Sequence, residues 1–299
     1  MGHAFYSSTD RMSRAAVSYS ATKSRDDIFA QNRKGSIHTD MNPQGVVKRE
    51  ACDSETHPNT VPVQLYLDHT GSMGQVPEAL IREGLPKLIG KLIQNGVPDV
   101  TLMFGAVGDH ECDSAPLQVG QFESGDAEMD MWLERVWLEG GGGGNAGESY
   151  LLAWYFAGHH VYTDAFTKRG KKGFVFTVGD EPCLKALPIS ALKKIMGSTA
   201  VGESTYSLED LLAQAQEQNH VFHIHVKHGT TTSNYVDPAW KELLGQNLIV
   251  INDYTKLDET ISGIILSHVD KDTKDTKDIK VPEKVESTSK PKKESKITL

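Results

Sequence analysis

The chain has 299 residues, of which 38% are hydrophobic and 24% are charged, and its formal net charge is −9. This length and balance are typical of a globular protein with one large domain or two small ones. Residues 270–299 carry nine lysines against seven acids, so the remaining body is near −11. An acidic body excludes an ordinary nucleic-acid surface and suits cation binding.

Cysteine usage and hydropathy bear on the compartment. Cys52, Cys112 and Cys183 are odd in number and widely spaced, which fits neither a disulfide framework nor a paired-cysteine zinc site. The first residues lack the apolar core of a signal peptide, and no run of about 18 apolar residues occurs. We therefore expect a reducing, cytoplasmic location and no membrane partner.

The chain divides into three regions by composition. Residues 1–60 are polar with little periodicity and predict an N-terminal arm with one short helix. From 61 to 269, strand and helix patterns alternate, which is typical of an α/β domain with a mostly parallel sheet. Residues 270–299 form a low-complexity segment of mixed charge, and such a segment is expected to be disordered because it cannot bury enough apolar surface to offset its ordering entropy.

Within the middle region the apolar patterns place six strands and seven helices. The expected strands are 62–68, 99–107, 116–122, 173–179, 220–226 and 247–251. The expected helices are 75–95, 127–137, 147–160, 188–196, 208–218, 237–244 and 255–269. Gly84 and Pro86 predict an interruption of the first helix, Ser207 with Asp210 predicts a cap for the helix at 208–218, and residues 164–173 are expected to be a basic loop.

The most informative stretch is VPVQLYLDHTGSMG, residues 61–74. Val63, Leu65 and Leu67 alternate as in a buried strand, and the strand ends at an acid followed by a polar turn. Asp68, Thr70 and Ser72 follow a D-x-T-x-S pattern, which could direct three hard oxygen ligands toward one cation.

Two later stretches add to this turn. GGGGGNAGES, which ends at Ser149, is a glycine-rich loop that can approach a ligand closely, and Asn145 and Glu148 supply oxygens beside it. FVFTVGDEP is a second buried strand that ends in an acid, Asp180. Because the carboxyl ends of parallel strands meet at one edge of a sheet, these groups should converge on one crevice.

Residues 61–269 resemble the von Willebrand factor A (vWA) domain with its metal-ion-dependent adhesion site. DHTGSM is similar to that family's D-x-S-x-S motif, and the acid of VGDEP matches its fourth-strand acid. The family's separate loop threonine is absent, and the glycine-rich loop looks like the G-G-G-D-x-P-E loop of alpha-kinase-linked members. Gly108-Asp109-His110 is similar to the R-D-H segment of the same subgroup.

The resemblance implies a Rossmann-like fold, with a central, mostly parallel six-stranded sheet and helices on both faces. It also implies a Mg²⁺ ion, or Mn²⁺ or Ca²⁺, bound directly by Thr70 and Ser72. Asp68 and Asp180 would assist, and Asn145 or Glu148 would complete the site. The expected function is cation-dependent binding of a protein partner through its acidic group, as an adhesion or scaffold module and not as an enzyme.

Two alternatives to this function stay open. One is a metal-dependent hydrolase or phosphatase that uses the same turn. The other is a structural vWA module whose metal site is degenerate and empty. The motifs alone do not identify the partner.

Overall fold

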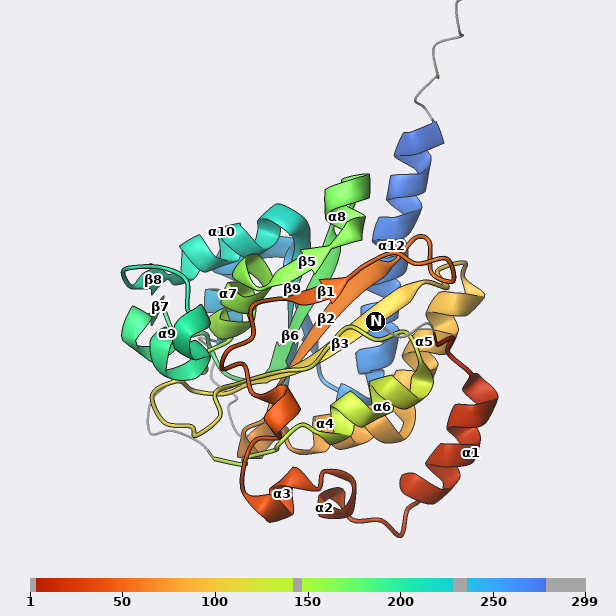
Figure 1. The fold of residues 1–299 in the computed structure, drawn as a ribbon, viewed down its shortest axis with the longest axis horizontal. Helices are drawn as coiled ribbons and strands as arrows, with labels where there is room; N and C mark the ends of the chain where they lie inside the picture. The colour runs from red at the N-terminus through yellow and green to blue at the C-terminus, as the bar shows by residue number, and fades with distance from the viewer. Residues whose placement is uncertain (1–3, 142–146, 228–235, 278–299) are drawn as a thin grey trace, which may run out of the picture.

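A six-stranded sheet forms the centre of the protein (Figure 1). The computed structural model describes residues 4–141, 147–227 and 236–277, and for Ser72 and residues 270–277 the backbone alone. In spatial order the strands are β10 (Leu248–Ile251), β9 (Asn219–Val226), β6 (Gly173–Gly179), β2 (Val61–Asp68), β3 (Val100–Val107) and β4 (Leu117–Val119). Five run parallel and β4 is antiparallel to β3. The predicted α/β fold with a mostly parallel six-stranded sheet is confirmed.

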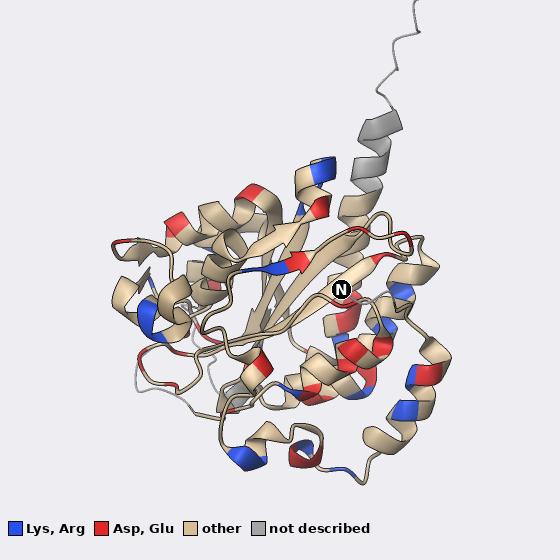
Figure 2. Ribbon diagram, in the orientation of Figure 1, with Lys and Arg blue, Asp and Glu red and all other residues tan. Residues whose placement is uncertain are grey.

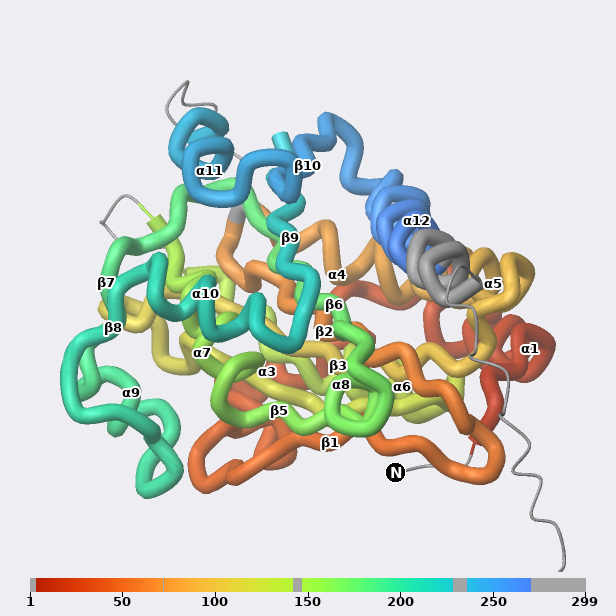
Figure 3. The backbone as a smooth tube through the Cα atoms, turned by 90° about the horizontal axis from the view of Figure 1, so that it is seen from above, coloured from red at the N-terminus to blue at the C-terminus, as the bar shows by residue number. Residues whose placement is uncertain are grey.

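Helices cover both faces of this sheet, as predicted. One face carries α4 (Gln75–Ala79), α5 (Leu85–Gln94), α6 (Asp126–Glu134) and α12 (Leu257–Lys277). The other carries α7 (Leu151–His159), α9 (Ile189–Met196), α10 (Leu208–Gln218) and α11 (Val236–Leu244). Figure 3 shows α5 and α12 side by side on one flank, with α7 and α10 on the other.

The two faces build two separate apolar cores. Val63, Leu65 and Leu67 of β2 point into the first core, while Tyr66 points into the second. This alternation is the period-two pattern of the sequence, and strands buried on both faces are expected in a parallel sheet. The cap on α10 is also confirmed, because Ser207 Oγ accepts from the Asp210 N–H at 3.1 Å.

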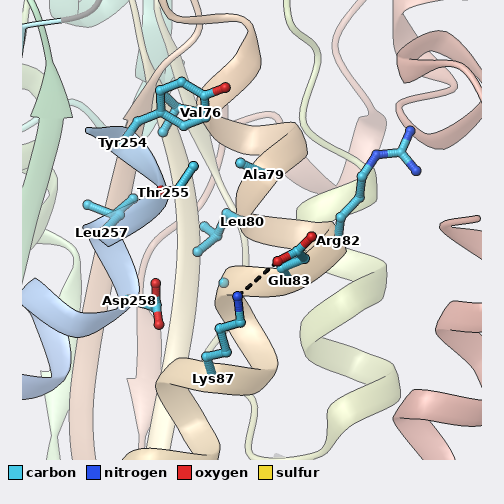
Figure 4. Close-up of a pocket in the computed structure, with 11 residues that line it drawn as sticks. Val76, Ala79, Leu80, Arg82, Glu83, Lys87, Tyr254, Thr255, Leu257 and Asp258 are labelled. Carbon is cyan, nitrogen blue, oxygen red and sulfur yellow. Dashed lines mark hydrogen bonds and ion pairs between the residues drawn. The ribbon is translucent and has the colours of Figure 1, made fainter. Parts of the chain in front are cut away.

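The helix that follows the D-x-T-x-S turn is interrupted where Gly84 and Pro86 predict it. A π-helical segment, Leu80–Gly84, joins α4 to α5. Pro86 has no N–H to return to the carbonyl four residues earlier, so the regular α-helical pattern cannot run through this point. A hollow of about 150 Å³ lies between this helix and the start of α12. Figure 4 shows side chains of both helices around it, with the Glu83–Lys87 ion pair alongside.

The N-terminal arm is more structured than predicted. It contains three helices, α1 (Ser8–Ser18), α2 (Arg25–Ile28) and α3 (Gln31–Lys34), and a strand, β1 (Arg49–Ala51), that pairs in parallel with β5 (Val161–Thr163). Arg11 is buried, where it forms an ion pair with Asp130 at 2.9 Å and donates to the Ile81 carbonyl at 2.7 Å. The arm is therefore held by polar contacts to the helices of the first face and by apolar side chains such as Phe29 and Met41, which are fully buried in the first core.

Three predictions differ most from the structure. The expected basic loop at 164–173 contains a helix, α8 (Asp164–Arg169), whose first turn is capped by the Thr163 hydroxyl and which ends at Gly170 with a left-handed backbone. The helix expected at 147–160 begins only at Leu151. The helix α12 continues past 269 to Lys277, because extending a formed helix costs far less than nucleating a new one.

Both ends of the described chain lie near the edge at which the parallel strands begin, called here the amino edge. The Ala4 carbonyl contacts His57 Nε2 at 3.1 Å, and His57 in turn contacts Asp99, which directly precedes β3. Toward its end, α12 passes Pro62 and Phe174, at the starts of β2 and β6. Figure 1 shows α12 running out beyond the sheet. No helix in the described part of the chain is long and apolar enough to cross a membrane.

Candidate metal centre

The D-x-T-x-S turn lies at the end of β2, on the edge where the parallel strands finish, called here the carboxyl edge. Asp68 is fully buried, and its Oδ1 accepts from the Thr70 N–H at 2.8 Å and from the Thr70 hydroxyl at 2.5 Å. Such bonds from a short polar residue two positions on are typical of a tight Asx turn. The chain then enters a 3-10 turn, Gly71–Met73, which contains Ser72, two positions after Thr70.

The glycine-rich loop lies directly against this turn, as the sequence predicted. The Gly71 N–H donates to the Gly141 carbonyl at 3.1 Å, and the Gly140 N–H donates to the His69 carbonyl at 3.2 Å. A Cβ on Gly71 would lie 3.2 Å from the Gly140 oxygen, so glycine allows this close approach. Asn145, the predicted amide ligand, lies outside the described residues.

The far end of the same loop is attached to the segment that follows Asp180. The Glu148 N–H donates to the Pro182 carbonyl at 2.9 Å, and the Leu184 N–H donates to the Glu148 carbonyl at 2.9 Å. Asp180 is fully buried at the end of β6, and Glu148 is 5% exposed. The chain leaves β2 for β3 on one side while β6 lies on the other, so Asp68 and Asp180 flank a topological switch point of the kind at which ligands bind in open α/β sheets.

These acids perturb one another electrostatically. Burial, supported by the charge of Asp180, raises the pKa of Asp68 to about 7, although hydrogen bonds from Thr70 and Tyr150 act against the rise. Burial raises the pKa of Glu148 to about 10, and the charge of Asp68 is the next largest cause of the rise. Buried carboxyls that disfavour one another's ionisation repel one another when they are charged. A bound cation would offset this repulsion.

Tyr150 is a site residue that the sequence did not reveal. Its hydroxyl donates to Asp68 Oδ2 at 2.7 Å, and its ring packs against His223 and Trp240 with centroid distances of 4.9 and 5.5 Å. A Cβ on Gly179 would come within 1.8 Å of the Tyr150 hydroxyl oxygen, so the last residue of β6 must be glycine for this bond to form. No periodicity or motif links Tyr150 to Asp68.

Asp109 is a third acid at a strand end, just after β3. It is fully buried, and its Oδ1 accepts from the Glu111 N–H at 2.9 Å while its own N–H donates to Asp113 Oδ2 at 2.7 Å. Its buried Oδ2 has no hydrogen-bond partner within the described ranges. Asp109 belongs to the Gly108-Asp109-His110 segment noted in the sequence, and it lies two positions after the last residue of β3.

The donor set at this edge fits a hard divalent cation. The buried Glu148 Oε2 has no hydrogen-bond partner among the residues described. Buried oxygens are normally hydrogen-bonded, so this oxygen is a candidate ligand for a cation. Among the described residues, no three His, Cys, Asp or Glu side chains are arranged to hold a metal ion. A cation here would therefore need hydroxyl ligands from Thr70 and Ser72 in addition to carboxylates.

Comparison with known proteins gives similarity at the level of solved structures. No protein-family model and no curated protein sequence matches the chain. The open form of the pilus adhesin SpaC from Lactobacillus rhamnosus GG matches with a TM-score of 0.44 at 10% identity, over 75% of this chain and 31% of that one. Proximal thread matrix protein 1 from the mussel byssus matches with a TM-score of 0.44 at 10% identity, over 73% and 49%.

A further similar structure is the vWF domain of the type V pili tip protein Mfa5 from Porphyromonas gingivalis. Its TM-score is 0.41 at 9% identity, over 71% of this chain and 95% of that domain. This chain spans about a third of the length of the pilus adhesin. None of these values assigns the chain to a family.

Proposed function

We propose that the chain is a vWA-type binding module. It holds a divalent cation, Mg²⁺ or alternatively Mn²⁺ or Ca²⁺, at the carboxyl edge and through it takes an acidic group of a protein partner. The observation that carries this proposal is the convergence of buried acids from two strand ends and the glycine-rich loop, namely Asp68, Asp180 and Glu148.

The geometry of the turn suits a hydroxyl ligand. The Thr70 hydroxyl donates its hydrogen bond to Asp68 Oδ1, so the lone pairs of Thr70 Oγ1 remain available to a cation. A neutral hydroxyl ligand neutralises none of the cation's charge, and that charge can then attract a carboxylate from a partner.

The same contacts disfavour the phosphatase alternative. Asp68 Oδ1 accepts two hydrogen bonds from Thr70, and Asp68 Oδ2 accepts one from Tyr150. A nucleophilic carboxylate would have only one lone-pair site left, on Oδ2 of a fully buried side chain. Non-covalent binding of a cation and a partner acid requires no attack by this carboxylate.

Cation titration tests the metal centre. Mg²⁺, Mn²⁺ or Ca²⁺ should raise the melting temperature of the wild-type chain, because a ligand bound by the native state alone stabilises it, by about 2.7 kcal/mol at a hundred times Kd. Thr70→Ala with Ser72→Ala should abolish the effect. The matched control replaces an exposed pair, Ser204→Ala with Thr205→Ala, and should behave as wild type. A wild-type chain that none of the three cations stabilises would refute the proposal.

A second measurement tests the partner chemistry. The wild-type chain, immobilised in Mg²⁺, should retain partner proteins that EDTA releases, and the Thr70→Ala, Ser72→Ala chain should retain none of them. Free acetate at high concentration should compete, because it offers the same carboxylate to the cation. Retention that EDTA and acetate leave unchanged would show that the partner does not bind through the metal.

A further inference from the structure

A second hollow lies at the opposite edge of the sheet, among the strand starts. It encloses about 250 Å³ and is bounded by the first residues of β2, β6 and β9, by the end of α8 and by α12. We call it the amino-edge hollow; its lining includes Pro62, Phe174, His220, His268, Lys171 and Lys172. The volume lies just below the roughly 300–1,000 Å³ that small-molecule sites usually span.

Aromatic rings form one side of the amino-edge hollow. The rings of His220 and His268 lie 4.6 Å apart between centroids, and Phe174 lies 5.3 Å from the first and 5.8 Å from the second. Phe174 is 2% exposed and belongs to the core, whereas both histidines are partly exposed. A planar ring could therefore extend this cluster by edge-to-face or offset contacts.

Basic side chains also line the hollow. Figure 2 shows basic residues at the end of α8, and none of the described residues that line the hollow is acidic. The charge of Arg169 is largely matched, since Arg169 pairs with Asp53 and donates to the Thr60 carbonyl. Lys171 and Lys172 also line the hollow, and both have contacts of their own.

Lys172 is held in place by α10. Its Nζ donates to the Gln216 carbonyl at 2.6 Å, which fixes the ammonium group and leaves two further N–H donors. A positioned cation loses less side-chain entropy on binding an anion than a freely moving one.

We propose that the amino-edge hollow binds a small aromatic anion, that is, a planar ring that carries one carboxylate or phosphate group. The ring would lie against the Phe174, His220 and His268 cluster, and the anionic group would face Lys171 and Lys172. The chain's own C-terminal segment is not such a ligand, because residues 278–299 contain no aromatic residue. The hollow is separate from the metal centre, so EDTA should leave this binding unchanged.

Calorimetric titration at low ionic strength, with benzoate and phenyl phosphate as probes, tests the proposal. At least one of the two should bind, and comparing them identifies the preferred anionic group. Benzyl alcohol has the ring without the charge and inorganic phosphate has the charge without the ring, so each should bind about tenfold more weakly or not at all. If neither aromatic anion binds, or if benzyl alcohol or phosphate binds equally well, the proposal is wrong.

Paired lysine variants place the site. Lys171→Gln with Lys172→Gln should weaken the aromatic anion about tenfold. Lys193→Gln with Lys194→Gln removes the same charge from an exposed pair on α9 and should have no effect. If both pairs weakened binding of the aromatic anion equally, the effect would come from net charge alone, and the assignment of the site to the amino-edge hollow would be wrong. Histidine-ring NMR adds a readout that needs no variant, because the His220 and His268 signals should shift with the bound probe; unshifted signals would place the ligand elsewhere.

Discussion

Glu148 allows the electrostatics of the metal centre to be tested through stability. Burial and neighbouring charges raise its pKa from 4.5 to about 10. At pH 7 the unfolded chain therefore ionises this carboxyl while the metal-free native chain keeps it protonated. The native state binds the extra proton, so the contribution of Glu148 to stability falls as the pH rises from about 4.5 toward 10.

The size of this effect at pH 7 depends little on the native-state pKa of Glu148, because that pKa lies well above 7. From 4.5 to 7 is about 2.5 pH units, and at about 1.36 kcal/mol per unit the cost to the metal-free native state is about 3 kcal/mol. Replacing Glu148 by Gln removes the ionisation. We therefore expect the variant to be about 3 kcal/mol more stable than wild type at pH 7 in EDTA, with the difference vanishing near pH 4.5.

Urea unfolding followed by tryptophan fluorescence, repeated from pH 4.5 to 9 in EDTA, measures this difference. The control is Glu217→Gln, an exposed glutamate on α10, which should follow the wild-type curve. Saturating Mg²⁺ should reverse the order of wild type and Glu148→Gln, because the metal stabilises only a chain that retains the carboxylate. A gain below about 1 kcal/mol at pH 7, or one that does not change with pH, would refute the account of Glu148 as a buried, charge-repelled acid.

Three further changes probe the packing around the site and the arm. Arg11→Met removes one of the two arginines that pair with the buried Asp130. The free energy of unfolding measured in urea should fall by about 3 kcal/mol, and a fall of less than about 1 kcal/mol would show that the arm adds little to stability. Tyr150→Phe removes a donor to Asp68 and should weaken Mg²⁺ about tenfold by calorimetry, so an unchanged affinity would exclude a role for the tyrosine. Gly179→Ala places a methyl group against the Tyr150 hydroxyl and should lower the melting temperature by the equivalent of about 3 kcal/mol. In the control, Gly263→Ala, nothing lies within 4 Å of the new methyl group, so the melting temperature should not fall. Equal melting temperatures of the two variants would contradict the crowding of Gly179 by Tyr150.

The sheet and part of the site were predictable because they depend on short-range patterns. Val63, Leu65 and Leu67 fixed the position and the buried faces of β2 through their alternation alone. Parallel strands put their carboxyl ends on one edge, so finding Asp68 and Asp180 directly after two such strands was enough to place them together.

What the sequence did not reveal depends on contacts between distant residues. The bond from Tyr150 to Asp68 joins residues 82 positions apart, and nothing in either neighbourhood signals it. The arm helices lack a long apolar stripe and are held by ion pairs such as that of Arg11 and by single buried side chains such as Phe29, so periodicity underestimated them. The sequence does contain one local signal for these helices, because Ser24 and Asp27 form a capping box at the start of α2.

The location of the chain ends has a consequence for how the binding face is presented. Ala4 and the last turns of α12 lie at the amino edge, and the candidate metal centre lies at the carboxyl edge, across the length of β2. Anything joined to either end of this unit would meet the edge opposite the metal centre. A tether at either end would therefore leave the candidate metal centre on the side of the domain away from the attachment.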